Sequence, residues 1–271
     1  MHWIAWKPQL MFDRSQLLWK HRRLLWATTL TDVKMRFSGT ILGRLWTLLY
    51  PLMFLGLYAV VYTMIFKIKL GNYSTFEYVL LIFSGLIPFL GFSEALGGGV
   101  GCVLGNKGLV KNTLFPIELI PVKAVFASSV TMLVGLALLL IFLWGNGIVH
   151  ATQLMLPVII VLQLIFTVGL IWLLSAMNVF IPDIAQTVSI MTLFLMLVSP
   201  IAYTHEMIPP ALVPFMYPNP LYYLIMLYRD VAFIGVIPTS MLITFTCIAC
   251  GFFMLGGYVF SRLKPLFADY V

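Results

Sequence analysis

The sequence is poor in charged residues. Asp, Glu, Lys and Arg make up only 9% of its 271 residues, against roughly 25% in a typical soluble domain. With 62% hydrophobic residues and a mean hydropathy of +1.03, the chain has too little polar surface to cover a core in water. This composition excludes a soluble two-domain enzyme and also a membrane anchor that carries a large catalytic head.

Catalytic and nucleotide-binding motifs are absent as well. The nine acidic residues occur singly, without the paired carboxylates or the metal-ligand spacing of a membrane enzyme that acts on lipid-linked sugars. The phosphate-binding pattern G-x-x-x-x-G-K-[ST] does not occur. Cys102, Cys247 and Cys250 lie in apolar surroundings and imply no disulfide framework. We therefore expect no catalytic residue, no metal site and no cofactor held by this chain, which transports its substrate without transforming it.

Long apolar runs take the place of such motifs. A helix that crosses a hydrocarbon core of about 30 Å needs roughly 20 residues. Six runs reach this length, and they cover residues 45–66, 78–100, 122–144, 154–181, 184–203 and 236–260. The sequence therefore predicts an all-α integral membrane protein, with six transmembrane helices in one domain over residues 1–271.

The basic residues indicate the orientation of these helices. Six spans place both termini on one side, and thirteen of the sixteen Lys and Arg residues fall on that side. The remaining three are Lys67, Lys69 and Arg229. The positive-inside rule then predicts that both termini are cytoplasmic. Because the cations flank apolar runs, the net charge of +7 reflects membrane orientation, and we expect no nucleic-acid partner.

The N-terminal region, residues 1–43, is basic and aromatic. Around residues 17–28, apolar side chains share one helical face and basic side chains lie on the others. Trp19, Arg22, Arg23 and Trp26 suit a helix that lies among the lipid headgroups. A solvated helix is the alternative, which the two tryptophans disfavour.

The first span carries an aromatic residue at every fourth position. These residues are Trp46, Tyr50, Phe54, Tyr58, Tyr62 and Phe66. A spacing of four forms a slowly winding stripe along one side of a helix. Tyrosine hydroxyls facing lipid would lack hydrogen-bond partners, whereas a lumen holding a hydroxyl-rich ligand would suit them. Ordinary helix packing combined with interfacial aromatic belts is an equally open interpretation.

The second span contains a carboxylate and a face of small residues. Ser93, Gly97, Gly101 and Gly105 are four residues apart, a pattern that lets two helix backbones approach closely. Glu94 lies in the same helix, where a buried carboxylate is costly. Either proton coupling or a structural partner would explain this residue, and the sequence favours a partner or a water-lined position.

A short amphipathic segment, residues 105–118, follows the second span on the cytoplasmic side. It combines charged Lys107, Lys111 and Glu118 with apolar Leu109 and Phe115. This mixture favours a helix that docks into another protein's groove over a solvated connector, because a connector would have no use for its apolar residues.

A proline-rich apolar segment separates the fifth and sixth spans. Five prolines between positions 209 and 220 would break a spanning helix. Irregular backbone at membrane depth is tolerated only where it is buried in protein or lines water. We therefore expect re-entrant helices over residues 207–233, on the external side.

Several motifs together resemble the type-2 ABC exporter permeases of bacterial surface polysaccharides. They begin with Asp32–Gly39, Leu42–Trp46, Pro51, Asn106–Lys111 and Phe115-Pro116. Further matches are Pro182–Ile184, Ser199–Ile201, Ile208-Pro209, Asn219-Pro220, Tyr228–Asp230 and Phe260–Asp269. These motifs cover nearly the whole chain in order. One departure is Pro182, where the family often has Arg, so an ion-pairing role at that turn is in doubt.

The resemblance implies a homodimer in the bacterial inner membrane, each subunit bound to a cytoplasmic ATPase that holds ATP and Mg. It implies a channel for lipid-linked polysaccharide such as O-antigen, capsule or teichoic acid, with O-antigen favoured. In that arrangement the aromatic stripe lines the channel, residues 105–118 form the coupling helix, and the N-terminal helix guides the lipid headgroup. The periplasmic gate would include Pro209, Asn219, Pro220, Tyr228 and Arg229.

Two other transporter classes remain alternatives. A type-2 ABC exporter of a small amphiphile or drug would share the same fold. A proton-coupled secondary transporter is disfavoured, because apart from Glu94 the sequence has neither inverted repeats nor ionisable residues at the membrane midplane.

Overall fold

The structure is a computed structural model that describes residues 16, 18–36, 38–65, 73–111, 115–204 and 207–270. Some expectations fall outside these residues and are not addressed by it. They are Phe66 of the aromatic stripe, residues 1–15, 17 and 37 of the N-terminal region, and residues 112–114 of the 105–118 segment.

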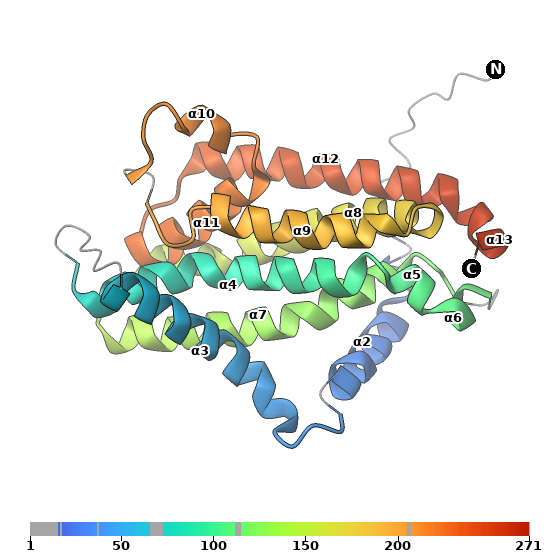
Figure 1. The fold of residues 1–271 in the computed structure, drawn as a ribbon, viewed down its shortest axis with the longest axis horizontal. Coiled ribbons are helices and arrows are strands. Elements are labelled where there is room, and N and C mark those ends of the chain that lie inside the picture. The colour runs from blue at the N-terminus through green and yellow to red at the C-terminus, as the bar shows by residue number, and fades with distance from the viewer. Residues whose placement is uncertain are drawn as a thin grey trace.

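The described residues form helices joined by loops, with no strand among them (Figure 1). Its longer helices are α2 (Arg22–Arg36), α3 (Trp46–Ala59), α4 (Thr75–Gly99), α7 (Leu119–Gly145), α8 (Leu156–Phe180), α9 (Asp183–Val198), α11 (Pro220–Arg229) and α12 (Thr239–Leu263). The short ones are α5 (Cys102–Gly105), α6 (Lys107–Lys111), α10 (Val213–Met216) and α13 (Phe267–Tyr270). Two π-helical turns, Val60–Ile65 and Asp230–Ile234, continue α3 and α11.

Five helical segments are long and apolar enough to cross a membrane. They are Gly43–Ile65, Thr75–Gly99, Leu119–Gly145, Ala151–Phe180 and Thr239–Leu266. Each corresponds to one of the six predicted spans. The remaining prediction, 184–203, is not confirmed at full length, because α9 has 16 residues and ends at Val198. At 1.5 Å per residue α9 extends about 24 Å, which is less than the thickness of a hydrocarbon core.

The central helix of the bundle is α4, which contacts α3, α7, α8, α9 and α11. It begins at Thr75 because Ser74 and Glu77 form a capping box, in which each side chain accepts a hydrogen bond from the other residue's backbone N–H. Gly91 and Gly99 allow close packing: a Cβ at either position would overlap Met132 or Ile171. The core of the protein is therefore built around α4.

The closest helix pair is α8 with α12. Gly169 and Gly256 face each other at their crossing, where a Cβ on either residue would overlap the opposing backbone. By contrast, the first span is only 11% buried, and α9 has no fully buried residue. The bundle thus has a tightly packed side at α8 and α12, and exposed apolar helices in α3 and α9.

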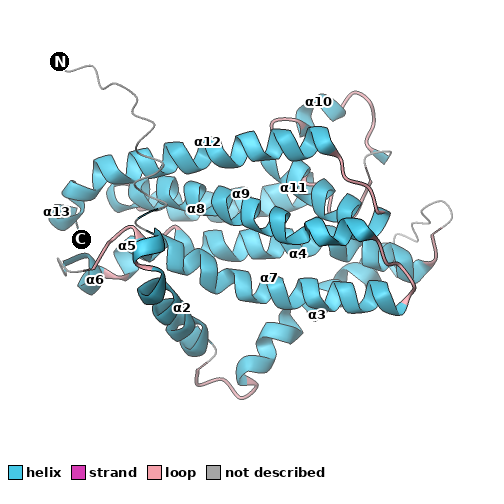
Figure 2. Ribbon diagram, turned by 180° about the vertical axis from the view of Figure 1, so that it is seen from behind, coloured by secondary structure: helices cyan, strands magenta, loops and turns pink. Residues whose placement is uncertain are grey.

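The two ends of the bundle differ in composition. The short helices α5, α6 and α13 gather at one end, and α10 with the loop before α12 lies at the other (Figure 1). Helices α2 and α3 diverge from the bundle and meet at the loop around residues 38–42, as both views show (Figure 2). The end with α6 and α13 carries Lys107, Lys111, Arg262 and Lys264, so it is the basic end.

Candidate functional site

The aromatic stripe runs along a half-buried side of the first span. The rings of Tyr58 and Tyr62 stack with centroids 5.8 Å apart, and the Tyr50 and Phe54 centroids are 5.0 Å apart. Phe54, Tyr58 and Tyr62 pack against the main core. Trp46 is also partly buried. The apolar side chains most exposed on this segment belong to other positions, namely Met53, Leu57, Met64 and Ile65. Tyr50 is exposed, so the described stripe packs only in part within the chain, and its lining of a channel stays a prediction.

A partly polar groove of about 430 Å³ runs between α4 and α9. Its polar and small lining residues include Ser93 and Gly97 of α4, Gly101 between α4 and α5, and Gln186, Ser189 and Thr192 of α9. The hydroxyls of Ser189 and Thr192 donate to carbonyls of their own helix, which leaves their oxygen lone pairs as acceptors. The groove offers a hydroxylated ligand hydrogen-bond acceptors between two apolar helices.

The small-residue face of α4 has a different use from the one expected. A Cβ at Gly97, Gly101 or Gly105 would meet nothing within 4 Å, so no helix among the described residues approaches these glycines closely. The expectation of a close backbone contact at this face is not met within the chain. The polar groove was not predicted from the sequence, because its second wall is formed by α9, which is distant from α4 in the sequence. Its signal was the spacing of three between Gln186, Ser189 and Thr192 in an apolar run.

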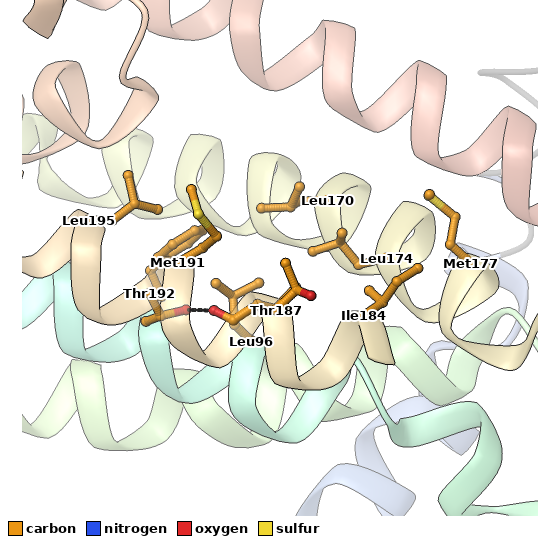
Figure 3. A pocket seen from close by; sticks show the side chains of 11 residues that line it. Leu96, Leu170, Leu174, Met177, Ile184, Thr187, Met191, Thr192 and Leu195 are labelled. Carbon is orange, nitrogen blue, oxygen red and sulfur yellow. Dashed lines mark hydrogen bonds between the residues drawn. The ribbon is translucent and has the colours of Figure 1, made fainter. Parts of the chain in front are cut away.

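A second groove, of about 360 Å³, lies on the other flank of α9 (Figure 3). It is lined mostly by apolar side chains of α4, α8 and α9, including Leu96, Leu170, Leu174 and Met191. Thr192 lines both grooves. With a groove on each flank and no fully buried residue, α9 is the long helix least tightly held by the bundle.

A partly buried ion pair joins α2 to the central helix. Arg36 pairs with Glu94, whose side chain is only 10% exposed, and Thr131 donates to the same carboxylate over 3.3 Å. Burial lowers the pKa of the Arg36 guanidinium, but arginine remains charged at neutral pH. Glu94 thus has a structural partner, which is the interpretation that the sequence favoured over proton coupling.

Two further ion pairs lie at the basic end of the bundle. Lys123 Nζ is 3.0 Å from a carboxylate oxygen of Asp32 and 3.4 Å from the amide oxygen of Asn106. Lys264 Nζ is 2.6 Å from Glu118 Oε1. The first pair holds α2 to α7, and the second connects the end of α12 to the start of α7. Ion pairs therefore connect α2 to both α4 and α7.

The 105–118 segment is not one helix. The described part forms α5 and α6, which are separated at Asn106, and the chain is irregular from Phe115 to Glu118. Val110 is buried, and Leu109 and Phe115 pack against the chain's own core. These apolar residues therefore have partners within the chain, and docking of the segment into another protein's groove stays a prediction. Glu118 also lies outside α6, since it precedes α7 and pairs with Lys264.

In α6, Lys107 and Lys111 point outward. Both side chains are exposed, as is Gly108 between them. Because α6 lies beside α13 at the basic end, these two cations form an accessible positive patch there. This patch, rather than an apolar helix face, is the accessible surface of α6.

The 207–233 segment divides into an exposed part and a buried part. Pro209 and most of the residues around α10 are exposed. Asn219 caps α11 by accepting from the Leu221 N–H, and Pro220 is the first residue of that helix. Tyr228 is fully buried and donates to Gln163 over 2.8 Å. Residues Asn219 to Arg229 therefore belong to the packed bundle, and their part in a periplasmic gate stays a prediction.

Arg229 is the most deeply buried charge among the described residues. It has no exposed surface, and it donates hydrogen bonds of 2.7–2.8 Å to the carbonyls of Pro200, Ile201 and Tyr203. These three residues form the irregular segment that follows α9. Arg229 therefore holds that segment in place, a role that the sequence did not indicate.

The N-terminal helix α2 packs against α7. Leu25 and Thr29 are its buried residues, whereas Trp19 before it and Trp26 within it are 71% and 65% exposed. Arg22 and Arg23 are exposed as well. Large exposed tryptophans beside arginines suit the predicted position among lipid headgroups, which stays a prediction.

Comparison with known proteins places these features in a family. The profile of the ABC-2 type transporter family matches residues 23–233. The chain is 26% identical over 248 residues to the O-antigen export system permease protein RfbA of Klebsiella pneumoniae, covering 91% of this chain and 94% of that protein. It is 28% identical over 187 residues to RfbA of Myxococcus xanthus, covering 69% and 70%. It is also 26% identical over 220 residues to the polysialic acid transport protein KpsM of Escherichia coli, covering 78% and 81%. The family match extends from α2 to the π-helical turn after α11, and on this ground the chain belongs to the ABC-2 type transporter family.

Proposed function

We propose that this chain is the permease subunit of an ATP-driven exporter that moves lipid-linked polysaccharide, and O-antigen in particular, across the bacterial inner membrane. The observation that carries the proposal is the likeness over 91% of the chain to a permease named for O-antigen export. The polar groove between α4 and α9 supports it, because a sugar chain needs hydrogen-bond partners inside the membrane.

The groove suits a long polymer better than a compact amphiphile. It is open, and its polar contacts come from small side chains spread along two helices. A conduit must bind its substrate weakly and at many points so that transport continues. The exporter of a small amphiphile or drug would use a more enclosed and more apolar pocket.

The exposed helices α3 and α9 support a homodimer. Several large apolar side chains of α9 are strongly exposed. Those of Ile190, Leu193, Phe194 and Leu197 are more than half exposed, and that of Met191 is 47% exposed. Exposed apolar surface on this scale suits lipid or a second copy of the chain. In the proposed dimer, the two copies of α3 and α9 enclose the lumen, so the polar groove faces the path of the polymer.

A separate cytoplasmic ATPase would bind the ATP and Mg, and both termini of this chain would lie on its side. The exposed Lys107 and Lys111 of α6 offer that subunit a positive docking patch. Closure of the ATPase would move α6 and α2 as rigid elements, and the Arg36–Glu94 and Lys123–Asp32 pairs would pass this movement to α4 and α7.

Filling the polar groove tests the transport path. Gly97→Leu places a side chain into the groove, and nothing lies within 4 Å of the added Cβ. We expect export in living cells to fall at least about tenfold, equivalent to an added barrier of about 1.4 kcal/mol. Gly98→Leu is the matched control, because Gly98 is equally open but does not line the groove. This control should export normally.

If Gly97→Leu loses export, its oligomeric state shows whether the groove is blocked or the dimer has dissociated. We expect it to remain dimeric in mild detergent and to bind the ATPase as the unchanged protein does. Dissociation into monomers would contradict the assignment, because the α4 face would then be a helix–helix contact. Equal export by both leucine variants would remove the groove from the transport path.

Charge reversal on α6 tests the docking patch. With Lys107→Glu and Lys111→Glu combined, we expect the ATPase to bind about tenfold more weakly or worse, since each rim charge contributes up to about 1 kcal/mol. Co-purification and the salt dependence of the affinity measure this effect. The charge-retaining variant, Lys107→Arg with Lys111→Arg, should bind normally. Tight binding by the glutamate variant would place the ATPase contact elsewhere.

A further inference from the structure

A third groove, of about 500 Å³, lies beneath the N-terminal helix. Helices α7, α8 and α12 form its walls. One edge is formed by the start of α2 and by the residues just before that helix. Apolar side chains such as Leu25, Phe126, Leu164 and Phe253 make up nearly all of the lining. Its volume falls within the range of about 300–1,000 Å³ typical of small-ligand sites.

This groove is separate from the proposed transport path. On α8, Val161, Leu164 and Val168 line it, whereas Leu170, Leu174 and Met177 of the same helix line the groove beside α9. At about 100° per residue these two sets project from opposite sides of α8. A ligand in the N-terminal groove would therefore contact the outer side of the bundle, away from α9.

The groove is elongated along the bundle. Its lining includes Val122 in the first turn of α7 and Val161 in the second turn of α8. Val161 lies 19 residues before the end of α8, a helical length of about 29 Å. That end of α8 lies at the basic end of the bundle, where Phe180 contacts Phe267 of α13. The groove therefore extends from the basic end far along the apolar part of the molecule.

A single positive charge lies at the mouth of the groove. Among the described residues that line it, Arg22 is the only charged one. Its guanidinium lies 4.7 Å from the centre of the Trp19 ring and donates to the Trp19 carbonyl over 3.0 Å. The remaining guanidinium N–H groups are available to an anion. A long apolar trough with one oriented arginine at its mouth matches an acyl chain with an anionic headgroup.

We infer that this groove binds an anionic phospholipid of the surrounding bilayer. One acyl chain lies along Phe126, Leu164 and Val168, and the phosphate is bound by Arg22. Trp19 and Leu25 contact the same acyl chain on the side of the N-terminal helix. The bound lipid therefore attaches this helix to the bundle. A second copy of the protein is disfavoured as the occupant, since the exposed apolar helices α3 and α9 lie elsewhere.

The natural cysteines provide a direct test. Cys250 lines the groove, whereas Cys247 is exposed and does not. With the delipidated full-length protein in detergent, we expect phosphatidylglycerol to slow alkylation of Cys250 by a membrane-permeant maleimide. At ten times the dissociation constant the slowing should be about tenfold, because only the lipid-free fraction reacts. Alkylation of Cys247 should not change, and phosphatidylcholine should protect neither thiol.

Two pairs of variants separate this site from general attraction to the membrane surface. Arg22→Gln should abolish the protection of Cys250, whereas Arg23→Gln removes a neighbouring exposed cation outside the groove and should preserve it. Leu164→Trp should fill the trough and exclude lipid, as measured by lipid retention in native mass spectrometry. Val161→Trp, at the exposed far end of the trough, repeats this test in case the first variant does not fold.

Several results would overturn the inference. Equal effects of Arg22→Gln and Arg23→Gln would mean diffuse electrostatic attraction. Equal protection by phosphatidylcholine would remove the role of the anionic headgroup. Retention of phospholipid after the trough is filled would place the lipid elsewhere. Co-purification of a polyprenyl diphosphate, in place of phospholipid, would assign the groove to the transported substrate.

Discussion

Replacing Arg229 with methionine should prevent the chain from folding stably. Arg229 has no exposed surface and satisfies three backbone carbonyls after α9, those of Pro200, Ile201 and Tyr203. Methionine has a similar length but no donor. Each carbonyl left without a partner costs about 1–3 kcal/mol, and irregular backbone at membrane depth has no water to replace the lost bond. The total approaches the entire stability of an ordinary domain, about 5–15 kcal/mol.

The yield of monodisperse protein in mild detergent and its melting temperature measure this effect. Arg262→Met is the matched control, because Arg262 is exposed near the end of α12. We expect this control to change the free energy of unfolding by no more than about 0.5 kcal/mol. Arg229→Lys, which keeps the charge but loses the planar fork of donors, should fall between the two. A stable Arg229→Met protein that fails only in export would instead support the gate role predicted from the sequence.

The long spans could be predicted because their signal is local. The run 122–144 became the helix Leu119–Gly145, and the run 154–181 became Ala151–Phe180, so the bounds differ by three residues or fewer. A helix that spans the bilayer needs about twenty consecutive apolar residues, whichever helices pack beside it. The proline-rich region also interrupted the helices as expected, since proline lacks a donor and disrupts the preceding turn.

The features that depend on partners distant in the sequence could not be predicted. The length of α9 was missed although its cause is local: Pro200 holds the preceding Ser199 in an extended conformation, so the helix ends at Val198, and only the capture of the following carbonyls by Arg229 depends on a distant residue. Likewise, the apolar residues of the 105–118 segment gave no sign of whether they pack on this chain or on a partner. Amphipathicity predicts that a face is covered but does not identify what covers it.

Neutralising Glu94 should uncouple the N-terminal helix from the bundle and strongly reduce export. Glu94→Gln keeps the shape of the side chain but removes the charge that pairs with Arg36. Because the Arg36 side chain is 32% exposed, water replaces part of the lost attraction, and we expect a cost of about 1–3 kcal/mol. Thr131→Val is the matched control, since it removes only the 3.3 Å hydrogen bond to the same carboxylate. It should cost about 1 kcal/mol.

The double variant distinguishes an ion-pair tether from a proton carrier. If Glu94 serves to hold Arg36, then Arg36→Gln combined with Glu94→Gln removes both charges and should recover a large part of the lost stability and export. If Glu94 carries protons, every variant without the carboxylate should fail, whatever residue occupies position 36. Export should also continue when the proton gradient is collapsed while ATP is maintained. Recovery in the double variant, together with export that needs no proton gradient, is what the Arg36–Glu94 contact predicts. Failure of the double variant with normal folding and dimerisation would return Glu94 to a role in proton coupling.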